Sequence, residues 1–270
     1  MLAVSGCGSA SGGHSSASAA KPGAKPAPTA KTGAAADAQY APALAKLAAR
    51  GMPVFCGGRA KPWVAFTFDD GPGPYTKLAG KILRHAHVPA TFFLVGRNVA
   101  QFPAGLKSDK RVGSFGDHSW THPELTTLST SAAEQEIAST KTAIEQAAHR
   151  RVMLFRPPYG ARNPDIDRIA RRHGMVEVLW NIDSADSLGA DHTRIARNVI
   201  AGLHPGSIVL MHENHGQTIR ALKYTIMPHL KHRKLQLVTV QQMLAEDPPT
   251  MSQLNRGRRG CGRVVGRFKA

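Results

Sequence analysis

Two adjacent carboxylates follow an apolar run near the start of the globular part of the chain. The run 63–68 ends at Asp69 and Asp70, and a turn rich in glycine and proline comes next. Two carboxylates so close repel each other unless a cation or a proton lies between them. Adjacent strand residues point to opposite faces, but at the end of a strand both can turn into one pocket. The alternative interpretation is that they only begin a turn, a common use of Asp before Gly-Pro.

A pair of histidines, His118 and His122, stands four residues apart. On a helical turn this spacing places both imidazoles on one face, where they can reach one metal ion. Together with a carboxylate from the first motif, they would form a site of two histidines and one aspartate that leaves positions open for water and substrate. Taken alone, the same spacing also suits two solvated or capping histidines.

Two further motifs supply a cation and a proton donor. Arg156 follows an apolar run and begins the sequence RPPYG, whose prolines stiffen the turn and leave the backbone N–H of Tyr159 well placed. Arg156 could pair with a carboxylate, hold it ionised and lower its pKa. The alternative is a surface arginine on a rigid loop. His212 ends the apolar run 207–211, and its titration range suits a general acid, although a buried structural histidine would look the same.

The elements that must position these motifs alternate between apolar strands and helices. Helical patterns occupy 131–149, 163–173, 191–203 and 216–231, between runs that are typical of buried strands. This order predicts an α/β fold with a parallel sheet covered on its outside and closed into a distorted (β/α) barrel, in which side chains at the carboxyl ends of the strands line the active site. A doubly wound open sheet is the second choice, but no GxGxxG sequence follows the first strand. The apolar runs are 63–68, 90–95, 152–155, 176–180, 207–211 and 235–240.

Taken together, the sequences TFDDG, HSWTH, RPPYG and LMH resemble the signature of the polysaccharide deacetylase family, which is the group with the NodB homology domain (carbohydrate esterase family 4). The resemblance extends over about residues 60–245. It implies a single catalytic domain with a distorted (β/α) barrel, and hydrolysis of N-acetyl groups of a glycan with release of acetate. It also implies that Asp70, His118 and His122 bind one divalent metal ion, usually zinc, with cobalt or manganese as alternatives.

The same resemblance implies a role for each remaining motif residue. Asp69 is the general base, and His212 is the acid that protonates the leaving amine. Arg156 holds Asp69, and the backbone N–H of Tyr159 stabilises the oxyanion together with the metal. Leu210 lines the pocket that receives the acetyl methyl group.

Two positions depart from the family pattern. The family usually has Asp-x-x-Asp-Trp before the last motif. Here Asp183 and Asp186 are kept, so Asp186 would still orient or tune the acid histidine. Ser187, however, replaces the tryptophan. This removes a large apolar surface beside the pocket and bears on substrate choice more than on the chemistry. Asp117 stands where the family more often has asparagine, and it would adjust the metal site or cap the turn.

Composition divides the chain of 270 residues into four parts. Residues 1–7 resemble a truncated lipoprotein signal that ends at Cys7, the expected lipidation site; a stray cysteine in an unstructured tail is the alternative. Residues 8–50 are rich in Ala, Gly, Ser and Pro and are predicted to be a flexible linker. Residues 51–250 hold the catalytic domain, and residues 251–270 form a basic tail.

The distribution of charge limits the partners. Of the net charge of +17, the tail carries +6 and the first fifty residues carry +4, so the catalytic domain keeps +7. We expect the basic termini to bind anionic cell-wall polymer or lipid headgroups, and no specific nucleic acid, because the tail has one aromatic residue and no platform for stacking bases. The substrate is expected to be an acetylated polysaccharide and the protein a monomer. No run of about 20 apolar residues is present, so no transmembrane helix is expected.

The three cysteines are too few for a disulfide scaffold and form no CxxC pair, which excludes a zinc ribbon. Cys56 and Cys261 bracket the catalytic domain. In an exported protein they would be joined and tie the tail to the start of the barrel; two free thiols are the alternative. We expect an extracytoplasmic bacterial protein, either a cell-surface lipoprotein or a secreted one.

The leading functional hypothesis is a metal-dependent N-deacetylase that acts on peptidoglycan or on a chitin-like polymer of N-acetylglucosamine. An O-acetyl xylan esterase is the enzymatic alternative, since the same machinery cleaves esters. A wall-binding protein of the same fold without turnover is the alternative of a different class.

Overall fold

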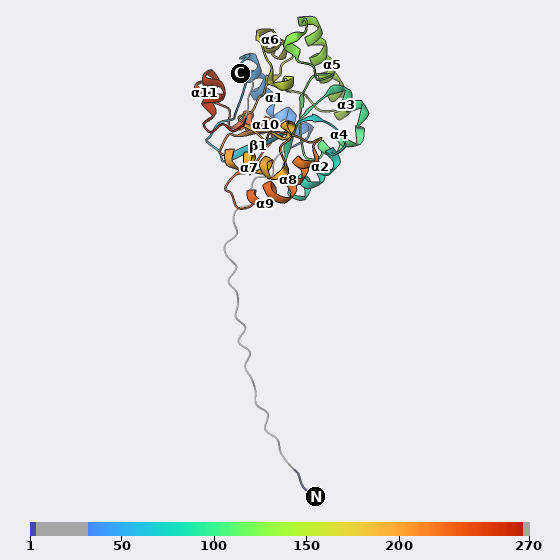
Figure 1. Cartoon of the computed structure of the whole chain (residues 1–270), viewed down its shortest axis with the longest axis vertical. Coiled ribbons are helices and arrows are strands. Elements are labelled where there is room, and N and C mark those ends of the chain that lie inside the picture. Colours follow the sequence, from blue (N-terminus) through green and yellow to red (C-terminus); the bar gives the residue numbers. More distant parts are fainter. Residues whose placement is uncertain (4–31, 267–270) are drawn as a thin grey trace.

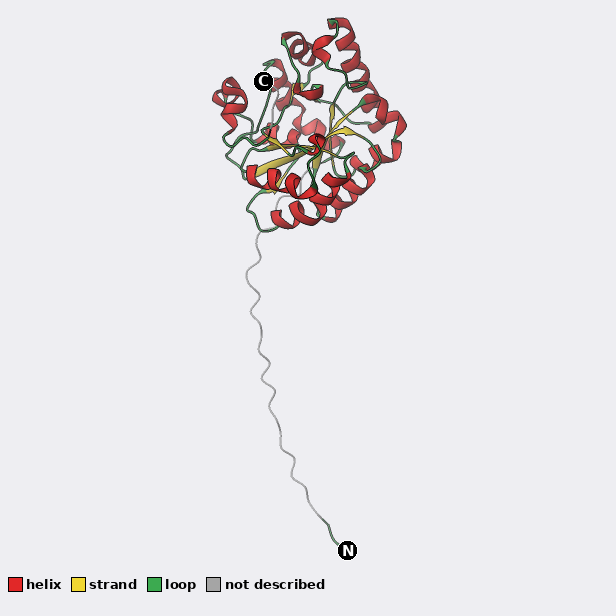
Figure 2. Cartoon of the chain, in the orientation of Figure 1, coloured by secondary structure: helices red, strands yellow, loops and turns green. Residues whose placement is uncertain are grey.

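The computed structural model describes residues 1–3 and 32–266. Cys7, residues 8–31 of the predicted linker and residues 267–270 lie outside the described part of the chain. The strands gather at the centre and helices surround them (Figures 1 and 2). The strands are β1 Trp63–Gly71, β2 Ala90–Leu94, β3 Gly113–Asp117, β4 Leu154–Phe155, β5 Val176–Glu177, β6 Ile182–Asp183, β7 Ile208–His212 and β8 Gln236–Leu237. The α-helices are α1 Ala34–Ala49, α2 Thr76–His85, α3 Gly96–Gln101, α4 Pro103–Asp109, α5 Thr130–Ala148, α6 Pro164–Arg172, α7 His192–Gly202, α8 Gly216–Ala221, α9 Met227–Leu230, α10 Val240–Glu246 and α11 Met251–Arg256.

The sheet is parallel throughout and runs in the order β5-β4-β3-β2-β1-β7-β6, with β8 paired to the start of β1. Helices follow most of the strands and cover the outside of the sheet (Figure 2). The predicted distorted (β/α) barrel is therefore confirmed. Because β1 lies between β2 and β7 and all three run the same way, their carboxyl ends meet at one edge. In this register Asp69 lies opposite His212 of β7.

The two faces of β1 pack into different parts of the core. Phe66 and Phe68 pack with the helices outside the sheet, whereas Trp63 and Ala65 pack with side chains of α1 and α10. Since alternate strand residues share a face, Asp69 continues the face of Trp63 and Ala65. The sequence alternation of β1 thus places one carboxylate on the inner face of the barrel.

The linker prediction is wrong for its last part, because residues 34–49 form helix α1. Tyr40 and Leu44 are buried in the core, and Ala36 and Leu47 extend the same apolar face. These four positions recur at the spacing of an amphipathic helix, and burying them offsets the entropy lost on ordering. The alanine-rich composition concealed this periodicity.

Both outer edges of the sheet are covered by short segments from the ends of the described chain. Val54 pairs with Val178, just beyond β5, and Val265 pairs with Ile182 of β6. Cys56 and Cys261 are joined by a disulfide, so the predicted bridge is present. It links the segment that covers β5 to the segment that covers β6. The predicted basic tail is therefore folded onto the barrel from α11 to Val265.

None of the helices formed by residues 32–266 has the length and apolar character that a membrane-spanning helix needs.

Candidate active site

The two carboxylates at the end of β1 turn toward one pocket. Asp69 is buried on the inner face, and strand alternation would send Asp70 to the outer face. Instead, the backbone at Asp70 has φ 68°, and the pairing of β1 with β2 shifts between Asp69 and Gly71. This irregularity breaks the alternation, so that both side chains line the same cleft.

Asp70, His118 and His122 form a group whose candidate ligand atoms all lie within 4.8 Å of one another. Asp70 Oδ1 lies 3.2 Å from His122 Nε2 and 3.5 Å from His118 Nε2. The histidines are not on a helical turn as predicted; they lie in the loop after β3, and Ser119 and His122 both have positive φ angles. The spacing of four residues is spanned by a tight turn, which brings the rings to 4.9 Å between centroids. The predicted grouping is therefore present, with a different backbone conformation.

The donor set of this group suits a divalent cation. His118 Nδ1 lies 2.7 Å from the carbonyl oxygen of Arg156, so Nδ1–H donates there and Nε2 turns its lone pair toward the group. Burial lowers the pKa of His118 to about 3, which keeps the imidazole neutral, the form that binds metals. Asp70 Oδ1 is buried and has no hydrogen-bond partner among the described residues. Lone pairs that converge in this way are stabilised by a cation between them.

Arg156 is completely buried behind Asp69 and is held by four acceptors. Its Nη1 donates to Asp69 Oδ1 at 2.7 Å and to Thr67 Oγ1 at 2.8 Å. Its Nε and Nη2 donate to the backbone oxygens of Val178 and Leu179 at 2.9 and 3.1 Å. These contacts fix the guanidinium and, through it, the orientation of the Asp69 carboxylate.

Two opposing effects act on the pKa of Asp69, and the lowering by Arg156 agrees with the sequence prediction. Burial raises the pKa of Asp69 above its ordinary value, and the charge and hydrogen bond of Arg156 lower it by less. Arg156 therefore offsets part of the cost of burying the carboxylate and does not reverse it. Because the pKa of Asp69 is raised, the carboxylate is a stronger proton acceptor than an exposed aspartate.

His212 is held by Asp186, as predicted. Its Nδ1 lies 2.7 Å from Asp186 Oδ1, and its backbone N–H donates to Oδ2 at 2.7 Å. Thr218 Oγ1 also donates to Oδ2, at 2.6 Å. Burial lowers the pKa of His212, but the charge and hydrogen bond of Asp186 outweigh this and raise it to about 9. Burial raises the pKa of Asp186, but the charge and hydrogen bonds of His212 outweigh this effect and lower the pKa to about 2.

These groups open onto a cleft of about 330 Å³. Tyr159 is half-exposed beside the cleft with φ 61°, Leu210 is buried in its wall, and Ser187 also lines it. Arg258 also lines this cleft and was not recognised in the sequence, where it is one cation within a basic run. The complete lining is Asp69, Asp70, His118, His122, Pro157, Tyr159, Gly160, Trp180, Asp183, Ser187, Leu188, Leu210, His212 and Arg258.

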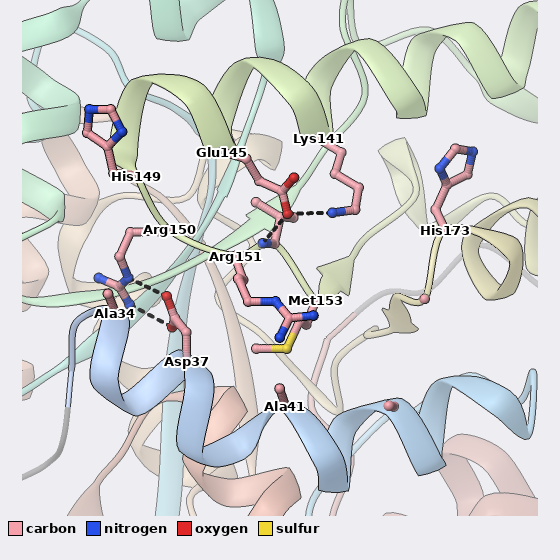
Figure 3. Close-up of a pocket in the computed structure, with 13 residues that line it drawn as sticks. Ala34, Asp37, Ala41, Lys141, Glu145, His149, Arg150, Arg151, Met153 and His173 are labelled. Carbon is pink, nitrogen blue, oxygen red and sulfur yellow. Dashed lines mark hydrogen bonds and ion pairs between the residues drawn. The ribbon is translucent and has the colours of Figure 1, made fainter.

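A larger cavity, of about 730 Å³, lies between α1 and the end of α5 (Figure 3). Its carboxylates are engaged with neighbouring cations: Asp37 accepts from Nε and Nη2 of Arg150, and Glu145 Oε1 lies 2.5 Å from Lys141 Nζ (Figure 3). None of the four sequence motifs contributes to the described lining of this cavity. The cleft at the carboxyl ends of the strands is therefore the candidate active site.

The fold and the site together place an Asp-His-His group, Asp69 and His212 at the carboxyl ends of the strands of a (β/α) barrel. The profile of the polysaccharide deacetylase family matches residues 57–178. A peptidoglycan-N-acetylglucosamine deacetylase of Bacillus cereus is 33% identical over 196 residues, which are 70% of this chain and 70% of that protein. The chain belongs to the polysaccharide deacetylase family.

Other proteins are similar to this chain over comparable lengths. The peptidoglycan-N-acetylglucosamine deacetylase PgdA of Listeria monocytogenes is 34% identical over 185 residues, and the match spans 68% of this chain but only 39% of that protein. The solved structure of the Bc1960 peptidoglycan N-acetylglucosamine deacetylase has a TM-score of 0.68 at 30% identity and covers 73% of this chain and 93% of that one. A Bacillus anthracis protein described as a pseudoenzyme of carbohydrate esterase family 4 has a TM-score of 0.67 at 31% identity. The match covers 72% of this chain and 69% of that one.

Proposed function

We propose that the protein is a metal-dependent N-deacetylase that removes acetyl groups from a cell-wall glycan, with peptidoglycan as the first candidate and a chitin-like polymer as the second. The observation that carries the proposal is the Asp-His-His group of Asp70, His118 and His122 beside Asp69. Asp69 Oδ2 lies 3.7 Å from His118 Nε2, so the base candidate borders the metal-ligand candidates. The Listeria and Bacillus cereus relatives, both peptidoglycan deacetylases by name, support the substrate class.

Asp70, His118 and His122 would hold a divalent cation, zinc first, with cobalt or manganese as alternatives. When bound, such an ion polarises the acetamide carbonyl and increases the acidity of a water molecule. Asp69 accepts the proton of the attacking water. Since Arg156 occupies its Oδ1, Oδ2 is the oxygen that faces the site.

His212 donates the proton that the leaving amine needs. Its Nδ1 is bound to Asp186, so Nε2 is the nitrogen left for the cleft that His212 lines. With a pKa of about 9 the imidazole is protonated at neutral pH and can act as a general acid. The base and the acid thus have different charged partners, Arg156 for Asp69 and Asp186 for His212.

Two further residues are assigned to substrate contacts. Leu210 offers an apolar wall for the acetyl methyl group, and the backbone N–H of Tyr159 would stabilise the developing oxyanion. In this proposal Ser187 leaves room that the family's tryptophan would fill.

The setting that we propose is outside the cytoplasm, in a lipoprotein anchored at Cys7 or a secreted protein. The disulfide between Cys56 and Cys261 supports an oxidising compartment. The basic terminal segments would then bind anionic wall polymers through sequence-independent charge attraction.

Acetate release tests the proposal directly. The zinc-loaded full chain is incubated with peptidoglycan, chitin oligomers and acetylated xylan, and the metal-depleted chain serves as the control. We expect acetate from peptidoglycan or chitin oligomers and none without metal. Release from acetylated xylan alone would indicate an O-acetyl esterase. Metal binding without release from any of the three would indicate a non-catalytic member of the family.

A further inference from the structure

The C-terminal strap, defined as residues 251–266, brings an arginine to the active-site cleft. Arg258 is the only Lys or Arg among the described residues that line the cleft. The strap lies beyond the part of the chain that matches the family profile, which ends at residue 178. Arg258 is therefore a feature of the cleft that the four catalytic motifs do not include.

The strap is fixed to the barrel on both sides of Arg258. Before it, Gln253 Nε2 donates to the backbone oxygen of Gly57 at 3.0 Å. After it, Cys261 is bonded to Cys56, and the backbone of Val265 pairs with both neighbours of Ile182. With these three attachments the strap holds Arg258 at a defined place in the cleft.

The end of the strap passes close to Asp183 of the cleft. A Cβ atom at Gly266 would lie 2.3 Å from the Cβ of Asp183, and Gly266 has φ 121°, so this position requires glycine. The close contact fixes the strap against the part of the cleft that Arg258 shares with Asp183. The backbone that carries Arg258 is thus held beside the cleft by contacts on both sides of this residue.

The surroundings of Arg258 suit an anionic ligand. Its guanidinium carbon lies 5.1 Å from the centre of the Phe55 ring, and the charge of Asp183 acts on it. Burial lowers the pKa of Arg258, and Asp183 opposes this shift. A guanidinium carries five N–H donors, more than one carboxylate can accept, so it can bind Asp183 and a second carboxylate together.

We infer that Arg258 is a substrate-binding residue that selects glycans carrying a carboxylate close to the acetamide that is cleaved. The inference rests on the proposed deacetylase function. A neutral chitin-like chain would cover a charged side chain without offering it a charge partner, which costs free energy. A carboxylate on a sugar or on an attached peptide would replace the lost water with charge-assisted hydrogen bonds.

The test compares one acidic and one neutral substrate in three variants of the full, zinc-loaded chain. The variants are Arg258→Gln, Arg258→Lys and, as the control with the same charge change on an exposed neighbour, Arg259→Gln. The acidic substrate is a peptidoglycan tetrasaccharide, supplied with its peptides or freed of them so that only the carboxylate on the sugar remains. The neutral substrate is chitotetraose.

For Arg258→Gln we expect KM for an acidic tetrasaccharide to rise by about tenfold, because a charge-assisted hydrogen bond is lost. Its kcat for that substrate and its KM for chitotetraose should stay within about twofold, since no group that touches the reacting atoms changes. Arg258→Lys should recover part of the loss, and Arg259→Gln should behave as the unchanged protein. The form of the tetrasaccharide that shows the effect identifies whether the carboxylate lies on the sugar or on the peptide.

Equal changes in KM for the acidic and neutral substrates, or no change for either, would overturn the inference. Titration calorimetry of the acidic tetrasaccharide into metal-free protein separates this outcome from a failure of the proposed function. If no substrate releases acetate but Arg258→Gln still weakens this binding about tenfold, the carboxylate site stands and the deacetylase proposal fails. If the binding is equally strong in both proteins, the carboxylate site fails.

Discussion

Asp186 contacts His212 at two points, accepting from the ring through Oδ1 and from the backbone N–H through Oδ2, both at 2.7 Å. The double contact orients the imidazole and keeps one carboxylate charge beside it. The charge outweighs the effect of burial and raises the pKa of His212 to about 9. The protonation state of His212 is therefore controlled by a residue that does not line the cleft itself.

Replacing Asp186 by Asn should shift the alkaline limb of the pH profile of kcat/KM to lower pH. Without the Asp186 carboxylate, burial lowers the pKa of His212 and only the smaller effects of Asp70 and Asp69 oppose it, so the protonated acid is lost earlier as pH rises. We expect a loss of about 10²-fold at pH 8. The measurement is acetate release from pH 5 to 10. Thr218→Val removes one hydrogen bond and no charge; it is the matched control and should shift the alkaline limb by less. An alkaline limb that stays in place in Asp186→Asn would rule out His212 as the acid.

Asp69→Asn and Asp70→Asn should separate proton transfer from metal binding. In the first variant we expect kcat to fall by about 10³-fold with metal content unchanged, because Asp69 accepts a proton and ligates nothing. In the second we expect loss of bound metal, since Asp70 Oδ1 is a member of the ligand group. Elemental analysis after dialysis and acetate release measure the two effects. Loss of metal from Asp69→Asn would contradict the division of roles.

Asp69→Asn also needs a stability control, because it leaves the fully buried Arg156 without its charge partner. Breaking such a pair from one side costs about 3–5 kcal/mol. Activity is therefore compared at a temperature at which circular dichroism shows both proteins folded.

Cys56→Ser should lower the free energy of unfolding by about 2–5 kcal/mol, because the disulfide closes a loop with a sequence separation of 205 residues. Urea unfolding of the oxidised protein measures the change. Cys261→Ser and the double variant should lose the same amount, since each removes the same bond. A double variant that loses twice as much would show that the thiols stabilise the fold separately.

The unfolding free energy should decrease as pH rises from about 5 to 8, partly through Glu213. Glu213 and Asp109 are buried, and neither carboxylate oxygen of Asp109 has a hydrogen-bond partner among the described residues. Burial, with repulsion from nearby carboxylates, raises the pKa of both groups, so the folded state holds protons that the unfolded chain releases above pH about 4.5. This contribution to stability is complete at low pH and is lost as pH rises.

Glu213→Gln isolates the contribution of this group. We expect its unfolding free energy, measured by urea titration at pH 5, 6.5 and 8, to fall less steeply with pH than that of the unchanged protein. Glu124→Gln, at a carboxylate that is less buried, is the control. A slope as steep in Glu213→Gln as in the unchanged protein would contradict the assignment.

The sequence predicts the strands that contain an apolar run and the helices that begin with a capping residue. Helix α6 begins after Asn163, whose side chain accepts from two backbone N–H groups, as the Asn-Pro pair indicated. Strand β3 was missed, because Gly113–Asp117 has a single large apolar side chain. A Cβ atom at Gly116 would lie 2.4 Å from the ring of Phe93, so close approach of backbone, together with the side chain of Phe115, buries this strand.

The motifs predict the members of the site but not its backbone. The four-residue spacing of His118 and His122 suggested a helical turn, and the same spacing is met by a loop with positive φ angles. The pKa of Asp69 is raised because the carboxylate is completely buried, and only the packing of the folded chain reveals this burial. Arg258 reaches the cleft through a disulfide and a strand pairing far apart in sequence, and no local pattern carries that information.

The pairing of Val265 with β6 has a consequence for shortened forms of the protein. A chain ended at residue 250, where composition places the end of the catalytic domain, loses Val265 and leaves the outer edge of β6 with unpaired backbone N–H and C=O groups. An exposed strand edge of this kind is a template for another chain. Recombinant forms that stop at 250 would therefore aggregate through β6, and the boundary of the folding unit lies beyond Val265.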